Sequence, residues 1–213
     1  FRCFAKKMNF GFTEAGVYRS LNKVDAPVPK IYGSLKASDG SEVVFLELLD
    51  RAGIQSEDDL VFERLLVTLA EFNAVDHLCV PSYQPEILRL HATWLQNAWQ
   101  AAHIGRLGST LRDVFANLPK HKHKLDLYLE ETLLRMSSRP LDATHHDPAN
   151  ANVGYNQNGR LVLFDLHYVT AYPRFKDLAL RLGASTSPFP ASRSIDDWIS
   201  VYLNSYNEFK ESC

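Results

Sequence analysis

Cysteine is scarce in this chain. The three cysteines, Cys3, Cys79 and Cys213, are an odd number, lie far apart and include no Cys-x-x-Cys pair. This pattern argues against a disulfide framework and against a zinc knuckle. A reducing compartment suits such a chain best, and we predict the cytoplasm.

Long apolar runs and an excess of charge of one sign are also missing. No segment approaches the roughly 18 apolar residues of a membrane span, and no signal peptide opens the chain. The 23 basic and 25 acidic residues nearly cancel. The chain therefore lacks the basic surface that binds nucleic acid or an anionic membrane, and we predict neither partner.

An initiator methionine is absent as well, because the sequence starts with FRCFAKKM, a segment with strand character. We therefore expect residues to precede Phe1. The 213 residues, 46% of them hydrophobic, are enough for one sizeable core or two small ones.

The first 49 residues predict a small, mostly β unit with one helix. FRCFAKKM reads as a strand, Thr13 caps a helix in TEAGVYRSL, and two prolines in APVPKIYGSL lead into another strand. Asp39 and Gly40 predict a hairpin turn, and the buried strand VVFLELL follows it.

From Ser56 onward the apolar residues recur at helical spacing, behind a segment, SEDD, that resembles a capping box. Helices are expected at 85–103, 110–117, 123–136 and 195–210 as well. The sequence thus predicts an α+β chain, with a β-rich unit at residues 1–49 and a helical unit at residues 50–213.

A hairpin with polar residues at its open end lies within the second unit. Asn158 and Gly159 in YNQNGRLVLFD predict a two-residue turn, which would place Asn152 opposite Asp165. An amide oxygen and a carboxylate so placed suit Mg²⁺, and Asp147, five residues before Asn152, could accept a proton nearby. The alternative is that DPANAN is a loop whose Asp and Asn side chains bind their own backbone.

The spacing His145-x-Asp147-x4-Asn152, with Asp165 after a hydrophobic strand, resembles the catalytic and metal-binding loops of the protein-kinase-like fold. Within that fold it is most similar to the aminoglycoside phosphotransferase and choline kinase group, because RFKDLA places Asp177 12 residues after Asp165. FAKK, TEAGVYRSL, APVPKIYGS, FLELLD and LAEFNA resemble other family segments in the same order. The resemblance implies two lobes, a truncated β-rich lobe at 1–49 and a helical lobe at 50–213.

The resemblance also implies roles around the catalytic loop. Asp147 would be the catalytic base, and Asn152 and Asp165 the Mg²⁺ ligands. His145 and Asp177 would support the loop without touching substrate.

On the nucleotide side, the resemblance implies that Glu14 pairs with a phosphate-anchoring lysine and that Glu47 and Leu49 contact the nucleotide. Only one of Lys6 and Lys7 can face the cleft, because successive strand residues point to opposite sides. The family pattern Ala-x-Lys favours Lys7, with Lys6 as the alternative. A solvated strand edge would account for both lysines without any such role.

The function implied is an ATP-dependent phosphotransferase, with GTP also open, that transfers the γ-phosphate to a hydroxyl of a small molecule such as an aminoglycoside, amino alcohol or sugar. Departures from the family leave a catalytically silent nucleotide-binding module as an alternative. His146 replaces a glycine, Ala149 and Asn150 replace His-Pro, DLHY follows the strand, and no glycine-rich loop is present. A third hypothesis is a metal-dependent hydrolase with ligands His145, His146, Asp147 and Asp165.

The acceptor and the oligomeric state are left open by the sequence. Trp198 and Tyr202 are expected to pack in the core, although they could wall a substrate pocket. Four acidic residues of the last predicted helix would suit a cationic substrate, but a solvated helix face explains them equally well: Asp196, Asp197, Glu208 and Glu211.

Overall fold

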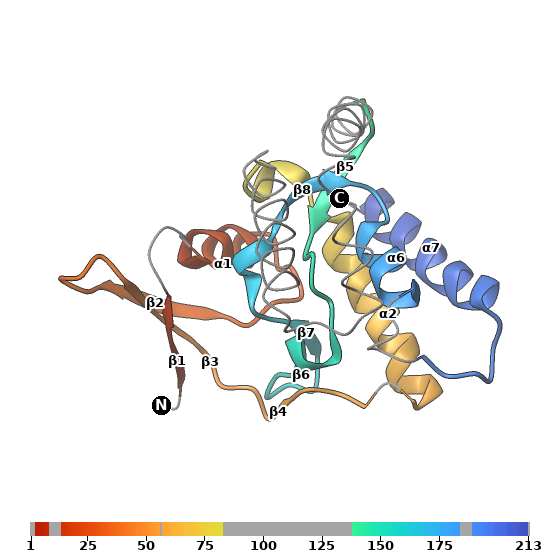
Figure 1. Cartoon of the computed structure of the whole chain (residues 1–213), viewed down its shortest axis with the longest axis horizontal. Coiled ribbons are helices and arrows are strands. Elements are labelled where there is room, and N and C mark those ends of the chain that lie inside the picture. Colours follow the sequence, from red (N-terminus) through yellow and green to blue (C-terminus); the bar gives the residue numbers. More distant parts are fainter. Residues whose placement is uncertain (1–2, 9–13, 56, 83–137, 184–188, 213) are drawn as a thin grey trace, which may run out of the picture. The chain divides into compact units, whose positions relative to one another are not determined.

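A computed structural model describes residues 3–8, 14–55, 57–82, 138–183 and 189–212 (Figure 1). The chain divides into two compact units, one made of residues 1–82 and 140–213 and the other of residues 83–139. The second unit lies outside the described residues apart from Ser138 and Arg139, and so do three of the predicted helices. The predicted lobe boundary at residue 49 stays a prediction.

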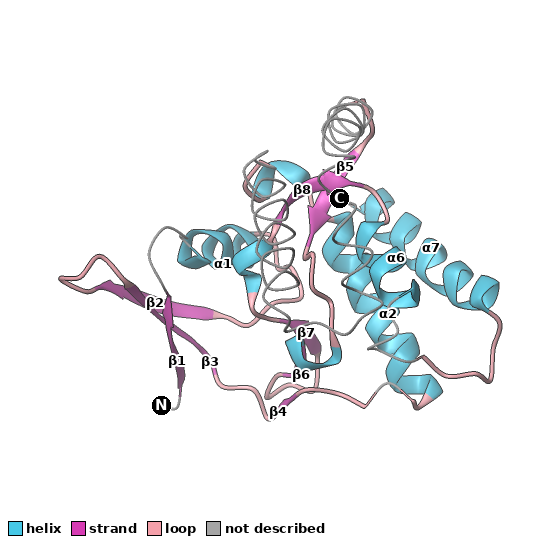
Figure 2. Ribbon diagram, viewed as in Figure 1, coloured by secondary structure: helices cyan, strands magenta, loops and turns pink. Residues whose placement is uncertain are grey.

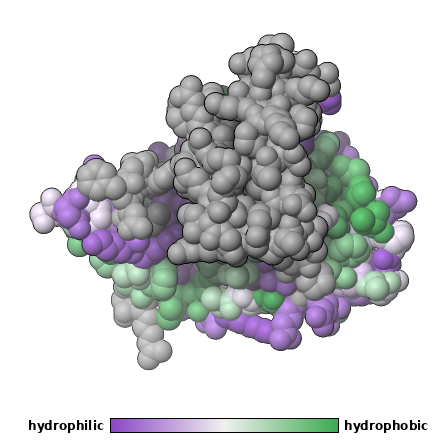
Figure 3. Space-filling model, viewed as in Figure 1, coloured by the Kyte–Doolittle hydropathy of each residue, from purple (hydrophilic) through white to green (hydrophobic). Residues whose placement is uncertain are grey.

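The first sheet of the larger unit has three antiparallel strands in the order β1-β3-β2. These are β1 (Cys3–Met8), β2 (Ile31–Lys36) and β3 (Glu42–Glu47), and helix α1 (Glu14–Lys23) lies between β1 and β2 in the sequence. Gly40 has a φ of 78°, which fits the predicted turn between β2 and β3, and that turn is hydrophilic (Figure 3). The strands and the helix predicted in the first 49 residues are therefore confirmed.

Three further helices gather on the other side of this unit, away from the first sheet and α1 (Figure 2). They are α2 (Asp59–Ala74), α6 (Lys176–Gly183) and α7 (Ile195–Ser212), which contact one another. Asp58 caps α2, because its carboxylate accepts hydrogen bonds from the N–H groups of Leu60 and Val61 at 2.9 and 3.1 Å.

Helix α7 explains two of the sequence expectations. Trp198 and Tyr202 are fully buried, and the Trp198 ring meets Phe62 edge to face at 4.9 Å, so their role in packing is confirmed. Asp197 forms a capping box with Ser194, whose N–H and hydroxyl donate to its carboxylate at 3.0 and 2.7 Å. This carboxylate is thus accounted for by the start of the helix.

Two further small sheets complete the unit. One has the order β4-β6-β7, with β4 (Arg51–Ala52), β6 (Val153–Tyr155) and β7 (Leu161–Leu163). The other pairs β5 (Leu141–Thr144) with β8 (Thr170–Pro173). Short 3-10 helices lie at η1 (His77–Cys79), η3 (Asn150–Asn152) and η4 (Leu166–Tyr168). Within the described residues, no helix has the length and apolar character needed to cross a membrane, and the cytoplasmic location stays a prediction.

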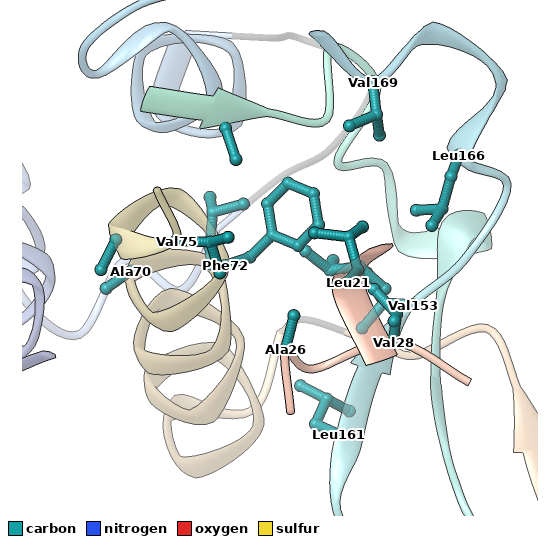
Figure 4. Packing of buried hydrophobic residues seen from close by; sticks show 14 of the residues in the cluster. Leu21, Ala26, Val28, Ala70, Phe72, Val75, Val153, Leu161, Leu166 and Val169 are labelled. Carbon is teal, nitrogen blue, oxygen red and sulfur yellow. The ribbon is translucent and has the colours of Figure 1, made fainter. Parts of the chain in front are cut away.

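One hydrophobic core joins these elements. Its members include Leu21 from α1, Phe72 from α2, Val153 from β6 and Leu166 from η4 (Figure 4). Each such side chain contributes about 1.5–3 kcal/mol when fully buried. The core therefore fixes the segment that carries Asp165 against the helix that follows β1.

The predicted register of the β6–β7 hairpin is wrong by one residue. Val153 pairs with Leu163, and the N–H of Phe164 donates to the carbonyl of Asn152 at 3.0 Å, so Asn152 lies opposite Phe164. The loop is longer than predicted because the Asn156 side chain accepts hydrogen bonds from two backbone N–H groups within it, at 3.0 and 2.9 Å. Such Asn-centred turns place Gly159, with φ 74°, in the left-handed position that ends a three-residue loop.

Candidate functional site

The catalytic-loop candidate begins where β5 ends, at the buried His145. The N–H of Asp147 donates to Nδ1 of this ring at 3.3 Å, so Nδ1 is unprotonated and Nε2 donates to the carbonyl of Phe164 at 2.9 Å. Burial lowers the pKa of His145, although the nearby Asp177 carboxylate opposes this shift. A neutral His145 therefore joins the loop to the end of β7.

Asp177, buried in the first turn of α6, holds the backbone of the same loop. Its carboxylate accepts hydrogen bonds from the N–H groups of His145 at 2.7 Å and of His146 at 2.9 Å. The Asn73 amide donates to Asp177 at 2.9 Å and to the carbonyl of Ala143 at 2.7 Å, and sequence reasoning had not identified this residue. An asparagine on the buried face of a predicted helix was the available signal, because buried amides require partners.

Asp147 and Asn152 meet at the exposed side of the loop. The amide nitrogen of Asn152 donates to the Asp147 carboxylate at 2.9 Å and to the Asp147 carbonyl at 3.0 Å. Since Nδ2 is used in this way, the side-chain oxygen of Asn152 is left without a hydrogen bond among the described residues. That oxygen is available to a ligand.

Asp165 follows β7 in a left-handed conformation, with φ 65°. One oxygen, Oδ1, contacts the Lys6 ammonium group and Nδ1 of His167, the latter at 2.8 Å. Burial alone would raise the pKa of Asp165, but the hydrogen bonds from Lys6 and His167 outweigh burial and lower it. Asp165 is therefore ionised at neutral pH, and in the described part of the chain its Oδ2 accepts no hydrogen bond.

The prediction that Lys7 pairs with Glu14 is wrong, because Lys6 does so. Nζ of Lys6 lies 3.2 and 3.1 Å from the two carboxylate oxygens of Glu14, whereas Lys7 forms an exposed ion pair with Asp39 at 3.1 Å. Val44, which pairs with Lys6 across the sheet, is 1% exposed, so Lys6 lies on the inner face. The family pattern therefore favoured the wrong one of two neighbouring lysines. Because successive strand residues face opposite sides, Lys7 points outward when Lys6 points inward.

Glu14 links the first sheet to the metal-site candidate. It is 2% exposed, and its Oε1 accepts a hydrogen bond from the N–H of Leu166, next to Asp165, at 2.7 Å. The same carboxylate binds Lys6. Because a buried carboxylate needs such partners, Glu14 fixes Lys6 and the segment after β7 in one arrangement.

A cavity of about 290 Å³ lies beside Lys6 and Asp165. Most of its lining is apolar, from Phe4, Pro29, Leu46, Leu48, Leu49, Ala52 and Phe164, and its other lining residues are Lys6, Tyr18, Glu47 and Asp165. Lys6, Glu47, Leu49 and Asp165 are thus brought together in the lining of one mostly apolar slot. Such a slot suits a flat base attached to an anionic group. Asp147 and Asn152 are not among the residues that line it.

The available oxygens fit Mg²⁺ better than zinc. Asn152 offers an amide oxygen and Asp165 a carboxylate oxygen, which are hard ligands of the kind Mg²⁺ prefers. Within the described residues, no three His, Cys, Asp or Glu side chains gather as a metal site. Both ring nitrogens of His145 are engaged with the backbone, so the hydrolase hypothesis, which needs His145 as a ligand, is wrong.

His146, which stands where the family has glycine, is bonded within the protein. Its φ is 70°, a value that strains a side chain, but both ring nitrogens have partners. Nδ1 accepts a hydrogen bond from Lys176, and Nε2 lies 2.7 Å from the hydroxyl of Thr170. Burial lowers the pKa of Lys176, whose ammonium group lies 4.4 Å from the centre of the Tyr172 ring. The histidine therefore attaches the loop to β8 and α6.

The chain has the protein-kinase-like fold of the aminoglycoside phosphotransferases. An aminoglycoside phosphotransferase from Streptomyces rimosus, solved with ADP and streptomycin, covers 98% of this chain and 83% of its own, with a TM-score of 0.56 and 13% identity. Spectinomycin phosphotransferase, solved with ADP and spectinomycin, aligns over 96% of this chain and 67% of its own length, with a TM-score of 0.57 and 10% identity. An aminoglycoside-3'-phosphotransferase of type VIII aligns over 99% of this chain and 79% of its own length, with a TM-score of 0.50 and 18% identity.

These identities are low, and the likeness shows the fold alone. The two-lobed α+β fold predicted from the sequence is thereby confirmed. Neither a family model nor a curated protein matches the chain.

Proposed function

We propose that this chain is a phosphotransferase that uses ATP, or GTP, with Mg²⁺ to phosphorylate a hydroxyl group of a small molecule. The observation that carries the proposal is the contact of Lys6 with both Glu14 and Asp165, because Lys6 and Asp165 also line a mostly apolar cavity. A cation held between two carboxylates beside an apolar slot is suited to a ligand with a flat base and a chain of phosphates.

Lys6 is the residue that we assign to the phosphates, in place of Lys7. Its ammonium group already carries two ion pairs, so it is oriented before a nucleotide arrives. A preoriented cation stabilises the charge of the phosphates without the cost of reorganising at the moment of reaction. Glu47 and Leu49, which line the cavity, would contact the base.

The metal would be held by Asn152 and Asp165. When bound, Mg²⁺ neutralises charge on the phosphates during transfer. Asp165 is kept ionised by Lys6 and His167, and Asn152 is held by its hydrogen bonds to Asp147. Both side chains therefore present an oxygen with a fixed direction.

Asp147 would orient the acceptor hydroxyl and accept its proton. One carboxylate oxygen, Oδ2, binds the Asn152 amide, which leaves the other for the substrate. His145 and Asp177 would position this carboxylate, because they bind the backbone of residues 145–147. Correct positioning is a large part of catalysis in phosphoryl transfer.

We propose the class of acceptor by analogy with the fold neighbours. The solved neighbours include complexes with streptomycin and with spectinomycin, both named in their descriptions. Asp196, Glu208 and Glu211 are exposed on α7 and could attract a cationic acceptor, whereas Asp197 caps the helix. We therefore place aminoglycosides and amino alcohols first in a screen.

The test is phosphate transfer from γ-labelled ATP to a panel of aminoglycosides, amino alcohols and sugars. We expect transfer by the wild type and a loss of at least about 100-fold in Asp147→Asn, since a positioned base contributes about that much. Glu57→Gln, which likewise turns an exposed carboxylate into an amide at a residue with no assigned role, is the matched control and should keep its rate. Binding of ATP without transfer to any acceptor would instead favour the catalytically silent module.

A further inference from the structure

Tyr18 is one of the residues that line the cavity, and its hydroxyl group has no hydrogen-bond partner among the described residues. It lies on α1 four residues after Glu14, is 0% exposed and lines the cavity beside Lys6 and Asp165. Its hydroxyl is buried and makes no hydrogen bond within the described residues. Buried polar groups normally have partners, so this exception requires an explanation.

Two other buried tyrosine hydroxyls in the described ranges do have partners. Tyr202 donates to the side-chain oxygen of Asn73 at 2.8 Å, and Tyr206 donates to the carboxylate of Asp142 at 2.8 Å. The fold thus supplies an acceptor to those two buried phenols. Tyr18 differs from them because its ring borders the cavity.

The phenol of Tyr18 is a hydrogen-bond donor at neutral pH. Burial raises its pKa well above the usual value, and the negative charges of Glu14 and Asp165 raise it further. The backbone N–H of Asp165 offsets part of this rise but does not form a hydrogen bond of normal geometry with the phenol. The proton therefore stays on the oxygen at neutral pH.

We propose that Tyr18 is a further nucleotide-binding residue, whose hydroxyl donates a hydrogen bond, directly or through one water, to an acceptor atom of the bound nucleotide. The inference rests on the proposed function, because it requires a nucleotide in this cavity. Apolar side chains make up most of the lining of the same cavity, among them Pro29, Leu46 and Phe164. Ring nitrogens and phosphate oxygens are the acceptors that a nucleotide would bring.

The proposal predicts opposite effects on the free and the bound protein. Tyr18→Phe removes a buried hydroxyl that has no partner, so the melting temperature of the free protein should be unchanged or higher. The affinity for ADP with Mg²⁺ should fall by about 5- to 30-fold, because the bound state loses a hydrogen bond. If the hydroxyl only stabilised the fold, Tyr18→Phe would lower the melting temperature and leave the affinity for ADP unchanged.

The experiment compares wild type, Tyr18→Phe and Tyr206→Phe by thermal melting and by calorimetric titration with ADP and with adenosine. Tyr206→Phe is the matched control, because its hydroxyl is bonded within the protein: its melting temperature should fall, and its ADP affinity should hold. A loss of affinity in Tyr18→Phe for both ligands places the acceptor on the nucleoside, and a loss for ADP alone places it on the phosphates. Either result supports the proposal.

Three results would overturn the inference. A lower melting temperature for free Tyr18→Phe would mean that the hydroxyl already has a partner. Equal ADP affinity in wild type and Tyr18→Phe would remove Tyr18 from the site and leave the proposed function intact. If the wild type binds neither ADP nor adenosine, the nucleotide site itself is wrong, and the role of Tyr18 is wrong with it.

Discussion

Lys6, on the first strand, contacts the carboxylate of Asp165, which follows a strand near the other end of the chain. The contact joins the β1–β3 sheet to the hairpin that precedes Asp165. The Glu14 carboxylate pairs with the Lys6 ammonium group. It also accepts a hydrogen bond from the N–H of Leu166, the residue that follows Asp165.

Lys6→Ala should abolish most phosphate transfer, whereas Lys7→Ala should not. Lys6 is positioned at the cavity, and loss of one preorganised charge of this kind costs about 10²- to 10³-fold in rate. Lys7 has only an exposed ion pair with Asp39, so its removal should change the rate less than about twofold. Steady-state rates with ATP and a confirmed acceptor measure both. Equal losses in the two variants would contradict the assignment of Lys6.

Asp177→Ala should lower the free energy of unfolding by about 3–5 kcal/mol. The change leaves the N–H groups of His145 and His146 and the Asn73 amide without their buried acceptor. Urea denaturation gives the value. Asp196→Asn, on the exposed face of α7, serves as the comparison and should stay within about 0.5 kcal/mol of the wild type. A small effect of Asp177→Ala would mean that the loop does not depend on this carboxylate.

The stability of the protein should fall as the pH drops below about 6.5, the pKa of an unfolded histidine. Burial holds the pKa of His145 below that value in the folded state, so the unfolded state binds a proton more readily. The stabilisation is therefore complete above pH 6.5 and is lost as the pH falls towards the lower folded pKa. Urea unfolding between pH 8 and pH 5 should show a weaker dependence in His145→Asn than in the wild type. Identical pH dependence in both proteins would exclude this role for His145.

Gly154→Ala should destabilise the hairpin, and Gly33→Ala should be tolerated. A Cβ atom at Gly154 would lie 2.5 Å from the carbonyl oxygen of Arg51 and 2.9 Å from Cδ1 of Leu49. Strand β4 would have to move, at a cost of about 1–3 kcal/mol, as in other overpacked sites. Gly33, also in a strand, has no atom within 4 Å of that position. Thermal melting of the two variants compares a crowded with an open glycine, and similar melting temperatures would contradict the close packing of β4 on β6.

Local patterns in the sequence predicted most of the described elements, because each has a short-range cause. The helical spacing from Val61 to Phe72 and the Asp39-Gly40 turn both appear where expected. The hairpin register was missed by one residue, since the bonds of the Asn156 side chain are set by geometry within the turn. The choice between Lys6 and Lys7 depended on which face of β1 is buried, and that depends on tertiary packing. For the same reason Tyr18 and the contacts of His146 could not be assigned from sequence spacing.

The central claim is that Asn152 and Asp165 hold a divalent ion at a nucleotide site. Electron paramagnetic resonance of Mn²⁺, used as a probe for Mg²⁺, measures this directly in the presence of ADP. We expect tight Mn²⁺ binding by the wild type in the presence of ADP, and a loss of at least about tenfold in affinity in Asp165→Asn and in Asn152→Ala. Unchanged Mn²⁺ affinity in both variants would contradict it.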